Sequence, residues 1–242
     1  MENKYVDIDF DHIEENFDEF YPSDIADSLK RISKKDREKF YEILHKIPDE
    51  ILGEVLLELP ESLRDKAYKS LSNTQISQAI EELETDDATD IIQDIEDIDE
   101  QKAKDILNSL DQEDQDDINW LKKYEEDEAG AYMQIELFSA HKDETIQDSI
   151  NRLKILKKND EIENIHQVFI VDDEQILIGS IGLEDLLTYD FDIKYDDILK
   201  NDTDHDYKPL SVVGDDDIDE VVKQFESYNL SVVALLDIKI DF

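Results

Sequence analysis

Short amphipathic segments follow one another along the first half of the chain. Within residues 22–124 the apolar side chains lie three or four positions apart, a spacing that gives a helix one buried face. Helices this short are only marginally stable in isolation, but helices stacked in series bury one continuous core. The last strongly apolar residue of each segment recurs every 12 or 15 positions, at Ile32, Leu44, Leu59, Leu71, Leu83, Ile95 and Leu110. The pattern therefore predicts a superhelix of short helices, similar to a solenoid.

Residues that begin helices separate these segments. Ser, Asn and Asp side chains accept hydrogen bonds from the unpaired N–H groups at a helix start, and proline suits the first turn. Acids also interact favourably with the positive end of the helix dipole. We expect helices to begin at Ser33, Pro48-Asp49, Pro60-Glu61, Ser72-Asn73, Asp86-Asp87, Asp99 and Asp111.

The hydrophobic pattern changes near Gly130. Runs typical of strands occupy residues 134–138, 168–171 and 176–181, with an amphipathic helix from Ile146 to Leu156 and a short helix from Glu184 to Leu187. The same order then recurs, with a strand at 210–213, a helix at 218–228 and a strand at 232–236. These two series predict a βαββα unit followed by a second copy of it.

We therefore predict an α plus α/β fold in three parts. A helical N domain occupies residues 1–130, the first repeat occupies 131–198 and the second repeat occupies 199–242. The second copy stops at Phe242, one strand and one helix early, so we expect the chain to be a fragment with sequence missing after that residue.

Charge changes this picture, because the chain holds 67 acidic and 25 basic residues and has a net charge of −42. A protein that binds nucleic acid or anionic lipid needs a basic face, so neither partner is expected. A mean hydropathy of −0.61 with this charge is typical of disorder, yet the hydrophobic 39% is patterned and supplies a core. Self-repulsion opposes compaction, so cations must relieve it, either as bulk salt or as bound divalent metal.

Several kinds of chemistry find no support in the sequence. The chain has no cysteine, which excludes disulfides, thiol nucleophiles and thiolate zinc sites. It shows no HExxH or GxSxG motif, so we expect no enzyme. It also lacks a signal peptide and an apolar run of membrane-spanning length, and we expect a soluble intracellular chain.

The order of the parts and several short phrases resemble the cytosolic half of MgtE-type magnesium channels. Residues 124–130 with Met133 are similar to that family's linker between an N domain and a pair of CBS domains, and residues 53–56, 81–90 and 171–173 also resemble the family. The resemblance implies a superhelical N domain followed by tandem CBS repeats. It also implies a connecting helix and a membrane pore beyond them, which this chain lacks.

By this resemblance, Glu54, Asp86 and Asp90 lie on an N-domain face that opposes the CBS domains across a magnesium-filled gap, with Asp87 as a neighbour. Asp86 and Asp90 are four residues apart, so both project from one helix face. Mg²⁺ takes about six oxygen ligands and retains several waters, so one or two carboxylates from each domain can hold it. The alternative is that Asp86 and Asp87 cap a helix and Asp90 is solvated.

On the CBS side, the resemblance implies magnesium ligands in residues 226–230. Asn229 stands where the family tends to have an acid, and Glu226 could replace it as a charged ligand. Many CBS pairs bind adenine nucleotides, and Asp185 takes the place of the residue that contacts ribose, so ATP is a weaker expectation. We interpret Asp185 in the first place as a plain helix-start acid, because Glu184 stands where phosphate would favour a basic residue and the net charge repels ATP. Residues 202–206 imitate a calcium loop but lack its glycine and final glutamate, so we interpret them as an acidic surface loop.

The resemblance implies a cytosolic magnesium-sensing regulatory region. Magnesium ions would bridge the acidic faces of the N and CBS domains and favour a closed pore. A homodimer through the CBS domains and a location at the cytoplasmic face of the inner or plasma membrane are implied in the same way. The alternative is a superhelical scaffold that holds a protein partner, with CBS-like repeats that sense a nucleotide. A shift of the melting temperature by magnesium or by ATP would discriminate the two.

Overall fold

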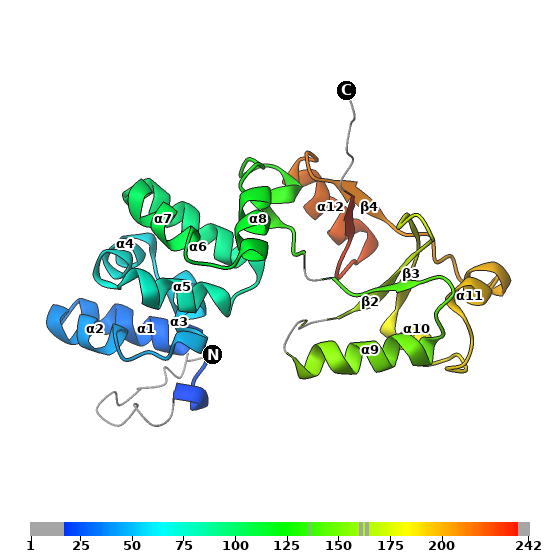
Figure 1. The fold of residues 1–242 in the computed structure, drawn as a ribbon, viewed down its shortest axis with the longest axis horizontal. Helices are drawn as coiled ribbons and strands as arrows, with labels where there is room; N and C mark the ends of the chain where they lie inside the picture. The colour runs from blue at the N-terminus through cyan, green and yellow to red at the C-terminus, as the bar shows by residue number, and fades with distance from the viewer. Residues whose placement is uncertain (1–16, 136, 160–161, 163–164, 237–242) are drawn as a thin grey trace. The chain divides into compact units, whose positions relative to one another are not determined.

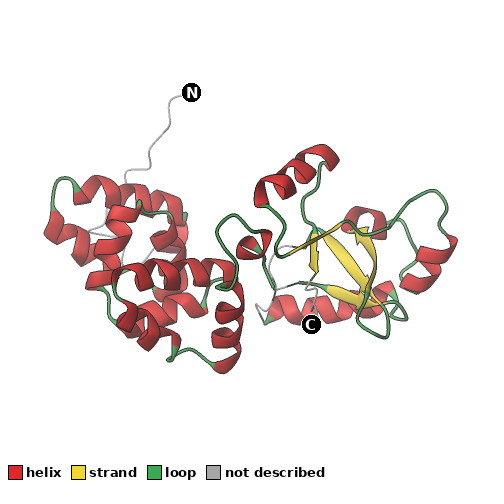
Figure 2. Ribbon diagram, turned by 90° about the horizontal axis from the view of Figure 1, so that it is seen from above, coloured by secondary structure: helices red, strands yellow, loops and turns green. Residues whose placement is uncertain are grey.

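A computed structural model of the protein describes residues 17–135, 137–159, 162 and 165–236 (Figure 1). The chain divides into two compact units, Met1–Lys122 and Lys123–Phe242. The first is helical throughout its described part, and the second combines helices with short strands (Figure 2). The predicted fold class is confirmed.

The first unit is the predicted stack of short helices. Contacts join α1 to α3, α3 to α5 and α5 to α7, and likewise α2 to α4, α4 to α6 and α6 to α8. Odd-numbered and even-numbered helices therefore form two layers around one core, which runs from Phe17 to Ile118. The elements are η2 (Phe17–Glu19), α1 (Pro22–Ser33), α2 (Arg37–Leu44), α3 (Asp49–Leu57), α4 (Glu61–Ser70), α5 (Asn73–Glu81), α6 (Thr85–Ile98), α7 (Glu100–Leu107) and α8 (Gln112–Leu121).

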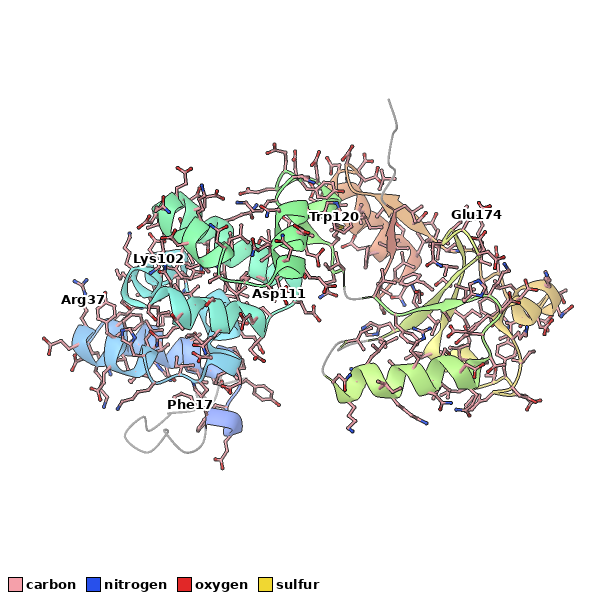
Figure 3. All side chains as sticks on the ribbon, viewed as in Figure 1. Phe17, Arg37, Lys102, Asp111, Trp120 and Glu174 are labelled. Carbon is pink, nitrogen blue, oxygen red and sulfur yellow. The ribbon has the colours of Figure 1, made fainter. Side chains whose placement is uncertain are left out.

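Most of the predicted helix starts are confirmed. The side chains of Ser72, Asp99 and Asp111 accept backbone N–H groups at the starts of α5, α7 and α8, and prolines precede α3 and α4. The start at Ser33 is wrong, because its hydroxyl donates to the Lys30 carbonyl and closes α1, and Asp36 caps α2 instead. Figure 3 labels Asp111 at the start of α8.

The predicted start of α6 at Asp86-Asp87 is also displaced. The first helical hydrogen bond runs from the Ala88 N–H to the carbonyl of Glu84, so α6 begins at Thr85. Glu84 occupies the N-cap position and makes no side-chain cap hydrogen bond. Asp86 and Asp87 therefore lie inside the first turn and not at the N-cap position.

Helices α3 and α5 approach closely at Gly53. A Cβ atom placed there would lie 2.7 Å from Leu83 Cγ and 2.8 Å from the carbonyl oxygen of Ala79. Nothing larger than a hydrogen fits between these helices at that point. This approach fixes α3 beside the turn that leads into α6.

The first repeat of the second unit has the predicted order of elements. It comprises β1 (Ser139–His141), α9 (Ile146–Lys158), β2 (Gln167–Val171), β3 (Leu177–Gly182) and α10 (Leu183–Leu186). Strand β2 lies between a parallel β1 and an antiparallel β3. Ile146, Ile170 and Ile181 are fully buried in the core of this repeat.

Two details of this repeat differ from the prediction. The strand expected at 134–138 is wrong for the described residues of that range, which precede β1; residue 136 lies outside the described residues, and the paired strand begins at Ser139. A helix that the sequence analysis missed, α11 (Tyr195–Asn201), follows α10. It buries Tyr195, whose hydroxyl lies 2.6 Å from that of Ser149.

The second repeat repeats the order on a smaller scale. It comprises β4 (Ser211–Val213), α12 (Ile218–Tyr228) and β5 (Ala234–Leu236), with β4 parallel to β5. The helix has its predicted bounds, and Asp217 caps it by accepting the N–H groups of Asp219 and Glu220. Three buried residues, Ala129, Val212 and Val221, form its core.

Candidate metal-binding face

Helix α6 carries a row of aspartates on the side away from its core. Asp86, Asp90 and Asp94 follow at four-residue intervals, whereas the buried side is made of Ala88, Thr89, Ile91, Ile92 and Ile95. Asp86 and Asp87 are half-buried and Asp90 is exposed. The predicted spacing of Asp86 and Asp90 thus presents two carboxylates on one face.

The far end of this row is occupied by protein partners. Arg64 Nε lies 3.1 Å from Asp94 Oδ2, and the Tyr68 hydroxyl donates to the same oxygen at 3.2 Å. Burial raises the pKa of Asp94, and the neighbouring guanidinium opposes that rise. Asp94 therefore ties α6 to α4.

Glu54 belongs to a different helix of the same unit. It is exposed on α3 and follows Gly53, the residue that contacts Leu83 just before α6 begins. Helix α3 also contacts α6 directly. The packing therefore brings the helix of Glu54 beside the helix of the aspartates, which the separation of these residues along the chain does not reveal.

Asp87 has an unusual environment within this face. Burial raises the pKa of its carboxyl above the ordinary value, so folding favours the neutral form. The charged form costs stability once the pH exceeds the unfolded pKa, and the full cost is present above the folded pKa.

We expect Asp87→Asn to raise the melting temperature of the metal-free protein at neutral pH, because it removes a poorly solvated charge from a strongly acidic helix. The gain should vanish near pH ~4, where the unfolded carboxyl is half protonated. Thermal melts of both proteins across this range measure the difference. A lower melting temperature for Asp87→Asn at neutral pH would instead show that the charge stabilises the helix start.

Glu226 and Asn229 lie in the second unit, at the C-terminal end of α12, and both are exposed. Asn229 takes a left-handed backbone conformation with φ 52°, and the Leu230 N–H bonds the carbonyl of Phe225. Asparagine tolerates this conformation better than most residues, so Asn229 ends the helix. Its role as a metal ligand stays a prediction.

Asp185 lies in the first turn of α10 and is partly exposed. The hydrogen bond to Asp202 raises the pKa of His205 and burial raises the pKa of Tyr207, and the charge of Asp185 adds to both rises. Asp202 accepts hydrogen bonds from Tyr189 and His205, and they hold its pKa well below the usual range. The segment expected to be an acidic surface loop therefore packs through Asp202 onto the first repeat.

One further group of metal-ligand type was missed by the sequence analysis. Among the described residues, His141, Asp143 and Asp173 have ligand atoms within 4.8 Å of one another. Both imidazole nitrogens are engaged, since Nδ1 accepts the Asp143 N–H at 3.2 Å and Nε2 lies 3.3 Å from Asp173 Oδ1. Lys142 pairs with Asp173, and Lys194 lies 3.5 Å from Asp143. These lysines neutralise the carboxylates and give the group a structural role.

Two known domain families match the chain, one over most of the first unit and one over part of the second. The MgtE intracellular N domain matches residues 20–127, and the CBS domain matches residues 129–192. A magnesium transporter MgtE of Enterococcus faecalis is 32% identical over 52% of this chain, and one of Thermus thermophilus is 26% identical over 50%. The aligned part spans about a quarter of each relative, 26% and 25% of their lengths.

Solved structures agree with this assignment. The cytosolic domain of the Mg²⁺ channel MgtE in complex with ATP is 25% identical, with a TM-score of 0.80 over 94% of this chain and 87% of that one. The soluble part of a magnesium transporter shares the fold, with a TM-score of 0.76 and 23% identity over 94% of this chain and 84% of that one. Among the helices described here, none has both the length and the apolar character that crossing a membrane requires.

Proposed function

We propose that this chain, which matches the MgtE intracellular N domain and the CBS domain, is the cytosolic region of an MgtE-type protein, and that it senses magnesium and regulates a magnesium channel or transporter. The observation that carries the proposal is the acidic face of the first unit. Asp86 and Asp90 share one face of α6, and the contact between α3 and α6 brings the helix of Glu54 beside it.

The chemistry of this face suits Mg²⁺. Carboxylate oxygens are its preferred protein ligands, and it retains several waters, so a few acids suffice when part of the shell is water. At low magnesium the net charge of −42 drives the acidic surfaces apart. At high magnesium, bound ions neutralise them and stabilise a compact form through the free energy of binding.

In this account, Glu226 and Asn229 on α12 supply oxygen ligands from the second unit. The compact form would close a pore in the complete protein, at the cytoplasmic face of the membrane. We also propose that the protein is a homodimer through its CBS domains, because closed two-fold assemblies are the commonest and the second repeat leaves Val222 and Tyr228 exposed on α12.

Thermal melts test the proposal. Millimolar MgCl₂ is expected to raise the melting temperature more than NaCl does at the same ionic strength. A single site at a free Mg²⁺ concentration of 100 times its Kd adds about 2.7 kcal/mol. Equal melting temperatures in the two salts would leave only general screening and would contradict the proposal.

Adenine nucleotide is the second ligand that we propose, because the similar cytosolic domain was crystallised with ATP. Asp185 is the candidate ribose contact, at the start of α10. The same melts with ATP, on the wild type and on Asp185→Ala, test this. A shift with ATP and none with magnesium would favour the alternative function, a protein-binding scaffold with nucleotide-sensing repeats.

A further inference from the structure

The connection between the two units is short and is held at both ends. On the N-terminal side, the Lys122 N–H bonds the carbonyl of Ile118 and closes α8. The Lys122 ammonium group pairs with Glu96 of α6. Lys122 is therefore fixed to the first unit.

On the other side, the ring of Tyr124 lies against two glycines of the second unit. A Cβ atom would lie 2.5 Å from this ring at Gly130 and 2.4 Å from it at Gly214. No described glycine has a positive φ, so Gly130 and Gly214 are required here for close approach and not for an unusual backbone. Together they form a seat into which the Tyr124 ring fits.

Backbone hydrogen bonds hold the residues after Tyr124 to the same place. The Gly130 N–H bonds the carbonyl of Gly214 at 2.9 Å, and the Ala129 N–H bonds that of Asp216 at 2.8 Å. The Ile218 N–H bonds the carbonyl of Asp127 at 2.9 Å. Ala129 is buried in the core of the second repeat. This segment precedes the first repeat along the chain, yet it is built into the second.

We propose that residues 124–130 anchor the incoming chain to the second repeat, and that Lys123, exposed between the two fixed ends, is the hinge of the N domain. Tyr124 is then a positioning residue. A movement of the N domain acts first on the turn between β4 and α12, since Asp217 of this turn both caps α12 and bridges to Glu128. Helix α12 carries Glu226 and Asn229, so the hinge and that half of the proposed metal site share one element. This consequence for regulation rests on the proposed function, whereas the anchor itself does not.

Because the chain has no cysteine, two introduced cysteines are the only sites that a thiol-reactive spin label can modify. A pair at Glu126 and Lys223 reports the anchor, and a pair at Lys69 and Lys223 reports the hinge; all three positions are exposed. In the wild type, the 126–223 distances should be narrowly distributed with and without MgCl₂. Tyr124→Ala should broaden both distributions, whereas Tyr21→Ala, the loss of an exposed tyrosine from the first unit, should leave the 126–223 distribution unchanged.

Two further variants keep the test decisive if Tyr124→Ala does not fold. Gly214→Ala should displace the ring from its seat and broaden the 126–223 distances. Lys123→Gly, which widens the range of backbone conformations at the hinge, should broaden the 69–223 distances and leave the 126–223 distances unchanged. A broad 126–223 distribution in the wild type, or one that neither Tyr124→Ala nor Gly214→Ala alters, would overturn the anchor. If the wild-type 69–223 distances do not change when MgCl₂ is added, the result contradicts the proposed function but not the anchor.

Discussion

Replacing Glu54, Asp86 and Asp90 together with alanine is expected to abolish most of the magnesium-specific stabilisation. In metal-free buffer the same triple variant should be as stable as the wild type or more stable, because three like charges leave an acidic face. This reversal of sign distinguishes ligands from helix caps. Loss of a cap would destabilise by ~1 kcal/mol with or without metal. Thermal melts in MgCl₂ and NaCl at equal ionic strength measure both effects.

A second triple variant supplies the control. Asp97, Glu100 and Asp105 are exposed and have the same composition of two aspartates and one glutamate. Asp99 is unsuitable, because its side chain caps α7 by accepting the Lys102 N–H at 3.1 Å. The control variant should keep the magnesium response. If both triple variants weaken it equally, bulk electrostatics explains the effect and the assignment of the metal-binding face is wrong.

Gly53→Ala is expected to lower the melting temperature of the first unit, although alanine favours a helix interior by ~1 kcal/mol over glycine. The added Cβ would lie 2.8 Å from the carbonyl oxygen of Ala79, a backbone atom that cannot turn aside. Overpacking of this kind costs about 1–3 kcal/mol. A shift of α3 would also move Glu54 relative to α6, so the magnesium response should weaken.

Gly182→Ala is the matched control for this substitution. Its added Cβ would lie 3.7 Å from Asp185 Oδ2, an ordinary contact, and Gly182 has φ −61° and ψ 146°, which alanine adopts readily. Its melting temperature should stay near that of the wild type. A Gly53→Ala protein as stable as Gly182→Ala would show that α3 and α5 can separate without cost.

Local signals predicted most of the fold. Helix α12 has its predicted bounds because Asp217 caps its start, Val221 packs inward and Asn229 ends it. The superhelix could also be predicted, because the apolar spacing and the start residue of each helix lie within its own short segment. The strand expected at 134–138 was misplaced because a short apolar run gives no boundary signal of its own, and pairing with β2 begins at Ser139.

Contacts between distant segments could not be predicted from the sequence. The seat of Tyr124 depends on Gly214, which only the folded second repeat brings close. His141 meets Asp173 because β1 and β2 pair in parallel, with His141 opposite Val171. At the metal-binding face, the spacing of Asp86 and Asp90 was visible in the sequence. The pairing of Asp94 with Arg64, which lies on another helix, could not be seen in the sequence.

The central claim is that magnesium draws the two units together by binding, and not by screening. Small-angle scattering of the wild type and of the Glu54, Asp86 and Asp90 triple variant, in MgCl₂ and in NaCl at equal ionic strength, tests it most directly. The account predicts a smaller radius of gyration in MgCl₂ for the wild type, and no difference between the two salts for the triple variant. A wild type with the same radius of gyration in both salts would contradict it.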